Sequence, residues 1–274
     1  MSGRLIFCSV FLATHVMFAT AHAGQQACTT LMAVVHSHAE PYDWQAPDTG
    51  AQHGLSVDFL QALAKQTQLT IKNIATKNTE KALREVRSGR VDLIIGVHNQ
   101  PEQDARLDYL YPAYAQQNYS IWLRAGEQVS LKQWPQLSGL RGVRALDSKK
   151  LPDFDTQVQL LAWPMRSVQD NKTATQEVLQ GQADYLIAEQ NRQQLYLQEG
   201  NLSDFFEVIE PPVATHQLFV ALSKDSACND LDMRNKLSKA LLELTKSALA
   251  QNRLNAVMQQ WQTLHSGDSS IKSE

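Results

Sequence analysis

The carboxylates Asp92 and Asp184 are the residues whose setting first suggests acid–base chemistry, because each precedes a short apolar run. A carboxyl group held in a cleft can accept or donate a proton during catalysis. Both aspartates, however, occupy the same position in a segment that occurs twice, at residues 82–96 and 174–188. An acid at the start of a strand commonly accepts hydrogen bonds from nearby backbone N–H groups. The repeat therefore favours a structural role for both side chains, and we predict no catalytic residue.

Two histidines, His36 and His38, have a spacing that a metal site could use. They lie two residues apart, so a strand would present both imidazoles on one face. Zinc takes three or four protein ligands, and Glu40 is the only further candidate close by in the sequence. The chain also has no Gly-x-Ser-x-Gly segment and no P-loop. We therefore predict neither a metal site nor a cofactor.

The repeated segment predicts how these residues are positioned. Six of the fifteen aligned positions are identical, and they include the glycine and the aspartate. In each copy a helical stretch ends at Gly89 or Gly181, where glycine can take the left-handed conformation that terminates helices, and a short apolar strand follows. Common descent of the two copies and independent use of one βαβ geometry both explain this match. With 274 residues available, the repeat predicts two α/β lobes.

The N-terminus is typical of a secretory signal. Arg4 provides a basic start, residues 5–13 are apolar, and Ala21 and Ala23 provide the small residues of a cleavage site. The apolar run is too short to span a bilayer, which disfavours the alternative of a retained anchor. No cysteine follows the cleavage site for lipid attachment, so an outer membrane would have to retain the protein. We predict a signal peptide at residues 1–23 and a Gram-negative periplasmic location.

Charge excludes one class of partner. The signal segment contains one basic residue and no acidic one, so its removal leaves 24 of 25 basic residues against 28 acidic residues, a net charge of −4. A slightly acidic chain without a run of Lys or Arg lacks the positive surface that phosphate backbones require. We predict no nucleic-acid partner.

Two cysteines, Cys28 and Cys228, remain after cleavage. In an oxidising compartment such a pair is a candidate disulfide, and the alternative is two unrelated buried thiols. A bridge between them would close a loop of roughly 200 residues and stabilise the fold by about 4 to 5 kcal/mol.

Apolar periodicity and turn residues predict the other elements. Strands are expected at residues 29–35, 69–74, 91–97, 118–123, 142–146, 185–188, 205–209 and 217–222. Helices are expected from Asp58 onward, at 80–87 and 191–198, and at two C-terminal stripes, 237–248 and 254–261, with a break at Asn252. Pro211 and Pro212 separate the last two strands, which suits a chain that crosses between lobes.

Several short motifs follow one another in a characteristic order along residues 29–262. They are Pro41-Tyr42, 54–63 (GLSVDFLQAL), 89–96 (GRVDLIIG), 108–112 (DYLYP), 137–143 (LSGLRGV), 181–184 (GQAD) and 222–225 (LSKD). In this order and spacing the chain resembles the family 3 extracytoplasmic solute-binding proteins, which serve polar amino-acid ABC transporters.

The resemblance implies the type II periplasmic binding protein fold, with two α/β lobes joined by a two-strand hinge. Lobe 1 would contain residues 24–117 plus 213–264, lobe 2 residues 118–212, and a flexible tail residues 265–274. Sheets of this kind bind ligands beyond the carboxyl ends of their strands, and a chain that crosses twice between lobes can close around a ligand.

The resemblance also implies ligand contacts in lobe 1, in the loop after the strand that follows Asp92. Here the loop supplies Gly96, His98 and Asn99. In the family an arginine follows and clamps the ligand carboxylate in a bidentate way. This chain has Gln103 or Asp104 at the matching place, and its nearest guanidinium is that of Arg106. This difference weakens the expectation of a standard α-amino acid.

In lobe 2 the family places a small turn at a helix start, where backbone N–H groups receive an anion. The matching residues are Asp147, Ser148 and Lys149; the aspartate would repel a carboxylate, and Ser148 or Lys149 would compensate. The acidic family residue that binds a ligand amine falls on Glu189. Its alternative role is that of a solvated acid at a strand end.

Two aromatic residues near the first strand, Tyr42 and Trp44, complete the candidate site. They would form a wall that stacks on the ligand or encloses a cation, or they would simply pack in the core.

The function expected from the resemblance is binding of a small polar solute, amino-acid-like or amine-bearing, for delivery to an ABC permease. Two alternatives share the fold: an enzyme similar to cyclohexadienyl dehydratase, with Glu189 or His98 as acid–base groups, and an input module for a membrane sensor. The expected partners are a small-molecule ligand and a membrane protein, and the expected state is a monomer.

Overall fold

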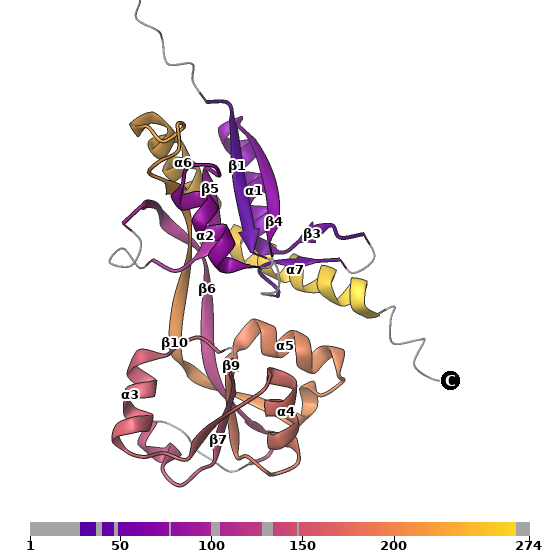
Figure 1. Cartoon of the computed structure of the whole chain (residues 1–274). Helices are drawn as coiled ribbons and strands as arrows, with labels where there is room; N and C mark the ends of the chain where they lie inside the picture. Colours follow the sequence, from indigo (N-terminus) through magenta and orange to yellow (C-terminus); the bar gives the residue numbers. More distant parts are fainter. Residues whose placement is uncertain are drawn as a thin grey trace, which may run out of the picture.

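The computed structural model describes residues 28–36, 40–46, 49–76, 78–99, 105–127, 134–146 and 148–266. An eight-stranded mixed sheet runs through the whole molecule in the order β4-β1-β5-β10-β6-β9-β7-β8. Helices pack against it at both ends, and two long strands connect the ends (Figure 1). This is the type II periplasmic binding fold with two α/β lobes, as the sequence predicted. The predicted signal segment, 1–23, lies outside the described residues.

Lobe 1 is built on three parallel strands. β1 (Thr30–His36) pairs with β4 (Thr70–Thr76) and with β5 (Leu93–Val97). Side chains alternate along these strands, so that Ala33 and Val35 face a cluster formed with helices α1 (Leu55–Thr67) and α6 (Leu231–Leu244). The opposite face, with Val34, packs on helix α2 (Thr79–Arg87). β1 and β5 are therefore covered on both sides, as buried apolar strands require, whereas the edge strand β4 is partly exposed.

Lobe 2 repeats this arrangement. β7 (Gly142–Ala145) pairs in parallel with β8 (Met165–Val168) and β9 (Tyr185–Glu189). One face packs on helix α3 (Pro152–Leu160) through Phe154, and the other face packs on helices α4 (Asn171–Leu179) and α5 (Gln190–Glu199). All five residues of β9 are buried. The sequence reading missed α3 and β8, because neither has a strong apolar period.

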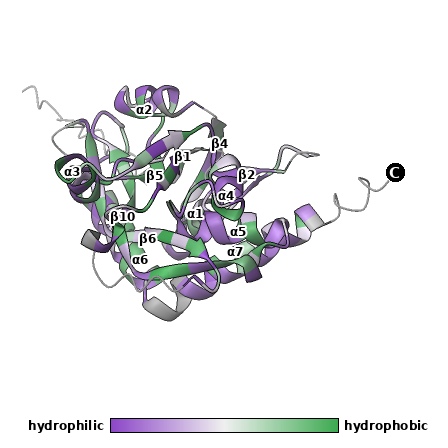
Figure 2. Cartoon of the chain, turned by 90° about the horizontal axis from the view of Figure 1, so that it is seen from below, coloured by the Kyte–Doolittle hydropathy of each residue, from purple (hydrophilic) through white to green (hydrophobic). Residues whose placement is uncertain are grey.

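Two strands of 18 residues each, β6 (Leu107–Arg124) and β10 (Phe206–Ser223), join the lobes. They pair antiparallel along most of their length and contribute to the cores of both lobes. The sequence predicted two separate strands around Pro211 and Pro212, whereas the structure has one strand with a register shift between Ile209 and Ala214. In Figure 2 the hydrophobic residues of these strands appear green, and hydrophilic residues of α2 appear purple.

Short elements complete the chain. They are β2 (Trp44–Gln45), β3 (Gln52–His53), η1 (Trp134–Leu137), η2 (Ser203–Phe205) and α7 (Ser247–Ser266). The predicted break at Asn252 is wrong: α7 runs through it, and the chain leaves helix α6 at Thr245. α7 extends from lobe 1 over α5 of lobe 2, where the Gln262 and Gln198 side chains are hydrogen-bonded (Figure 1).

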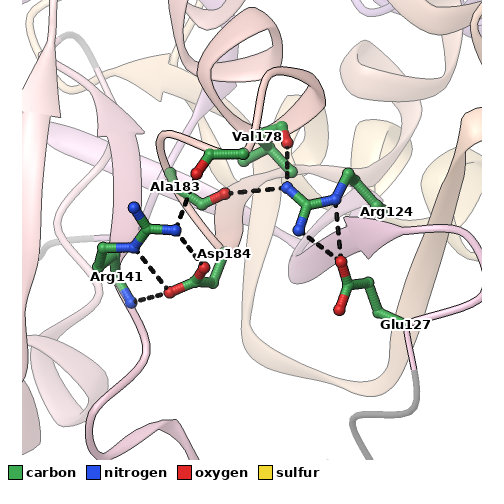
Figure 3. Close-up of polar contacts among 7 residues, drawn as sticks. Arg124, Glu127, Arg141, Val178, Ala183 and Asp184 are labelled. Atoms are coloured by element: carbon green, nitrogen blue, oxygen red, sulfur yellow. Dashed lines mark hydrogen bonds and ion pairs between the residues drawn. The ribbon is translucent and has the colours of Figure 1, made fainter.

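The two repeat aspartates have matching structural roles. Asp92 Oδ2 accepts a hydrogen bond from the backbone N–H of Met32 at 2.8 Å, and Asp184 Oδ2 accepts one from the backbone N–H of Arg141 at 2.7 Å. Met32 lies in the strand beside β5, and Arg141 lies just before the strand beside β9. Figure 3 shows the second copy, in which the Arg141 guanidinium also holds Asp184 and the carbonyl oxygen of Gly181.

A disulfide joins Cys28, immediately before β1, to Cys228, before α6. Both residues pack against the lobe 1 core. The bridge ties the start of the described chain to the segment that returns from lobe 2.

Candidate ligand-binding cleft

A cavity of about 410 Å³ lies between the lobes, beside the two connecting strands. Lobe 1 lines it with residues around Tyr42 and with the end of β5, the connecting strands add Gln117, Tyr119 and Leu218, and lobe 2 adds the residues around Ser148 and Glu189. Its position beyond the carboxyl ends of β5 and β9 is where open α/β sheets bind ligands. This volume suits a small molecule.

Glu189 stands at the point where β9 ends and α5 begins. Its Oε2 atom caps the helix by accepting the backbone N–H of Arg192 at 2.8 Å, and its Oε1 atom is 3.3 Å from the Asn191 amide nitrogen. The residue is only 7 % exposed, and burial raises the pKa of its carboxyl, although these hydrogen bonds oppose the rise. The carboxyl faces the cavity and can accept a further donor.

Tyr42 connects the lobes beside Glu189. Its hydroxyl lies 3.0 Å from Glu189 Oε1 and 2.9 Å from the carbonyl oxygen of Gln116 on β6, and it accepts the Asn191 amide at 3.0 Å. Burial, with the neighbouring Glu189 charge, raises the pKa of the phenol well above its usual range. A second contact between the lobes joins Arg192 Nε to Glu40 Oε2 at 3.8 Å. Glu40, Tyr42 and Glu189 all line the cavity.

Asp43 is a third acidic residue in the cavity lining, after Glu40 and Glu189. It is 3 % exposed and lines the cavity, and its Oδ1 atom has no hydrogen-bond partner among the described residues. Burial raises the pKa of Asp43 well above its usual range; the Glu40 charge adds to the rise, and a hydrogen bond from Ser56 opposes it. The Gln117 Oε1 atom is a second buried acceptor on the cavity without a described partner.

Basic side chains lie around His98, which directly follows β5. His98 Nδ1 lies 3.3 Å from the Gln217 carbonyl oxygen, and the His98 ring meets the His216 ring edge-on at a centroid distance of 5.2 Å. Burial first, and then the charges of Lys149 and His216, lower the pKa of His98 to about 4. Burial and Lys149 likewise lower the pKa of His216. Both imidazoles are therefore neutral at pH 7, and Lys149 is the cation near them.

The cavity lining thus carries both signs of charge. Glu40, Asp43 and Glu189 are its acids, whereas Lys149 lies near the His98 imidazole, which packs on His216. A solute with separated positive and negative groups matches this polarity.

Six of the ten ligand-contact residues predicted from the sequence line the cavity. They are Tyr42, Gly96, His98, Ser148, Lys149 and Glu189. Gln103, like Asp147, lies outside the described residues.

Three predicted contacts lie elsewhere. The Trp44 ring is buried between His53 and Trp261, on the side that packs against α7. The Asn99 amide meets the Tyr111 hydroxyl and is not part of the cavity lining. Arg106 is exposed, and its carbonyl oxygen accepts the backbone N–H of Lys224. None of these three side chains belongs to the cavity lining.

Sequence reasoning missed Asp43, Gln117 and Arg192, which line the cavity, and His216, which packs on His98. The first follows Tyr42 directly, so the motif that identified Tyr42 could have identified it. The other three lie on connecting strands or in the first turn of α5, and no local pattern marks them.

Among the residues that the structure describes, no group of three His, Cys, Asp or Glu side chains could hold a metal ion. Within the same residues no helix combines the length and hydrophobicity needed to cross a membrane.

Comparison with known proteins now places the chain. Residues 31–263 match the model of the bacterial extracellular solute-binding proteins, family 3. No curated protein matches the chain.

Several solved structures share the fold. A Streptococcus pneumoniae substrate-binding domain, the second of a protein described as an amino acid ABC transporter, has a TM-score of 0.69 and 13% identity and covers 83% of this chain and 99% of its own. The ancestral amino acid-binding protein AncCDT-1, a precursor of cyclohexadienyl dehydratase, has a TM-score of 0.55, 18% identity and coverages of 85% and 95%. The VFT2 domain of Bordetella pertussis BvgS has a TM-score of 0.60, 16% identity and coverages of 85% and 93%.

Proposed function

Because the chain belongs to the family 3 bacterial extracellular solute-binding proteins, we propose that it binds a small zwitterionic, amine-bearing solute between its lobes. The observation that carries this proposal is the polarity of the cavity. The lining contains the acids Glu40, Asp43 and Glu189, and it also contains Lys149, which lies close enough to His98 to lower the pKa of that imidazole. An ammonium group and a carboxylate would each meet the opposite charge.

Glu189 would receive the ammonium group. A buried carboxylate pairs strongly with a cation that enters the same low-dielectric site, because little water screens the pair. Ser148 and Lys149, with the imidazoles of His98 and His216, would surround the carboxylate. They replace the arginine clamp that is absent from the matching positions of the sequence.

The protein would act in a Gram-negative periplasm, as a monomer, after removal of residues 1–23. It would deliver the solute to an ABC permease. Family membership supports an extracytoplasmic role, and the form of the N-terminal sequence supports export.

A thermal-shift screen of amino acids, polyamines and organic acids tests the proposal, because a ligand that binds only the folded state raises its stability. The tightest hit is then titrated by calorimetry into the wild type, Glu189→Gln and the control Glu80→Gln. Glutamine retains an oxygen that can cap α5, so Glu189→Gln should fold normally and bind an amine ligand at least about a hundredfold more weakly. Glu80 is exposed on α2, and its variant should bind like the wild type.

A second candidate function is elimination chemistry similar to that of cyclohexadienyl dehydratase. The observation that favours it is that a carboxyl of raised pKa, Glu189, and a neutral imidazole, His98, line one cavity. Conversion of prephenate or arogenate by the purified protein, lost in Glu189→Gln, would establish this function in place of simple binding.

A further inference from the structure

Asp43 is an acid in the cavity wall whose own surroundings do not complete its contacts. Its side chain is almost fully buried, yet its Oδ1 atom accepts no hydrogen bond within the described part of the chain. The other neighbours are the Ser56 hydroxyl, which bonds the carboxyl, and Glu40, whose negative charge opposes ionisation. The described ion pairs include none that involves Asp43.

Two polar side chains near Asp43 already share a hydrogen bond with each other. Ser56 Oγ and the Tyr114 hydroxyl share a hydrogen bond of 2.7 Å, and both residues are buried. If Tyr114 donates to Ser56, Ser56 is free to donate to Asp43. Ser56 can therefore satisfy only part of the carboxyl, and Oδ1 is left without a partner in a residue that lines the cavity.

A buried carboxyl without a counter-ion is costly, and the cost falls when a cation enters the same site. Arg192, which lines the same cavity, pairs with Glu40. A cation that stabilises ionised Asp43 would therefore enter from the cavity.

We propose that Asp43 receives a second cationic nitrogen of the solute, an ammonium or guanidinium group, while Glu189 receives the first. This proposal rests on the proposed function and specifies it further. The solute class is a small zwitterion with an additional basic group, for which Asp43 selects.

Two matched pairs of probes test the selection. L-Lysine and L-norleucine have nearly the same shape and differ in the distal ammonium, and L-arginine and L-citrulline differ in the charge of the guanidinium. Calorimetry at pH 7 should show that the wild type binds the charged member of at least one pair about tenfold or more tightly. This measurement needs no variant and so does not depend on how a variant folds.

The variant Asp43→Asn keeps the shape and removes the charge. It should bind the two members of the same pair within about threefold of each other, while its affinity for the neutral member changes little. Asp204→Asn is the matched control, because Asp204 is exposed and does not line the cavity. The control should keep the wild-type preference.

Two further readouts separate binding from a purely structural role. Titration in phosphate and in Tris should show proton release when the charged probe binds to the wild type and less release for Asp43→Asn, because burial raises the pKa of the Asp43 carboxyl and a nearby cation lowers it. The ligand-free melting temperature of Asp43→Asn should equal or exceed that of the wild type. A structural role predicts a fall in melting temperature with the preference intact.

Equal binding of charged and neutral probes by the wild type, or an unchanged preference in Asp43→Asn, would overturn the assignment of Asp43 and leave the proposed function standing. If the wild type binds none of the four probes and no other amine in the screen, the proposed function itself fails.

Discussion

The Tyr42 hydroxyl lies 3.0 Å from Glu189 Oε1, which joins residues 147 positions apart and links lobe 1 to lobe 2. The same hydroxyl lies 2.9 Å from the Gln116 carbonyl oxygen, but it has one proton and cannot donate to both acceptors. A protonated Glu189 satisfies all three groups, since it donates to Tyr42 while Tyr42 donates to Gln116. The raised pKa of Glu189 agrees with this arrangement.

Replacement of Tyr42 by phenylalanine should therefore destabilise the protein. It removes a buried hydrogen-bonding group and leaves the Gln116 carbonyl oxygen without this donor, at a cost of about 1 to 3 kcal/mol in the free energy of unfolding. Urea denaturation measures the change. Tyr111→Phe is the control, because Tyr111 is 57% exposed, and it should change stability by about 0.5 kcal/mol or less. Equal stability of Tyr42→Phe and the wild type would contradict the hydrogen-bond arrangement.

Ionisation of Glu189 should make protein stability and ligand affinity depend on pH in opposite directions. Its folded-state pKa is raised, so its contribution to stability is present at low pH and is lost as the pH rises through that pKa. An ammonium ligand needs the ionised carboxylate, so affinity should fall as the pH is lowered through the same pKa. Calorimetric titrations measure the affinity and urea denaturation measures the stability, both over about pH 5 to 8, the range in which proteins are usually most stable. Glu189→Gln should lack this component of each.

The repeat aspartate Asp184 should contribute to stability in a pH-dependent way. Its hydrogen bond and ion pair with Arg141 lower its pKa. That contribution is present above the pKa of about 3.9 for an unfolded aspartate and is lost as the pH falls through the lower folded value. Asp184→Asn should cost about 1 to 3 kcal/mol at pH 7, with Asp204→Asn as a near-neutral control. A difference between the two variants that does not shrink as the pH is lowered from 7 would refute the ionic part of this explanation.

Alanine should be tolerated differently at the two repeat glycines. Gly89 and Gly181 both have left-handed backbones, with φ of +71° and +72°, and this alone costs alanine about 1 to 2 kcal/mol. At Gly89 the added Cβ would also lie 2.3 Å from the Asp225 carbonyl oxygen, whereas at Gly181 the nearest atom is a flexible Arg124 nitrogen at 3.6 Å. Urea denaturation should therefore show that Gly89→Ala lowers the free energy of unfolding by about 1 to 3 kcal/mol more than Gly181→Ala does. Equal losses of stability in the two variants would show that the left-handed backbone conformation alone determines the cost of alanine.

Loss of the Cys28–Cys228 bridge should lower stability by about 4 to 5 kcal/mol, because the bridge restricts an unfolded loop that spans a sequence separation of 200. The double variant Cys28→Ser with Cys228→Ser measures this loss without added reductant. Treatment of the variant with dithiothreitol is the control and should have no further effect. A variant as stable as the wild type would mean that the bridge does not restrict the unfolded chain.

Much of the fold follows from local patterns in the sequence. The repeat with Gly89 and Gly181 predicted two α/β lobes, because helix termination at a glycine and a short apolar strand are properties of neighbouring residues. The two long strands were predicted only in part. Antiparallel pairing of β10 with β6 carries the strand past Pro211 and Pro212, which local propensity treats as a stop.

The site was decided by tertiary structure. The sequence suggested Glu189 and Tyr42 separately, but only the closure of two lobes along β6 and β10 places the phenol against the carboxyl. The position of Trp44 also depends on tertiary structure. The pairing of β2 with β3 stacks its ring on His53, away from the cavity. Local order in a chain fixes periodicity and turns, whereas contacts between distant residues depend on how strands pair and which way their side chains then point.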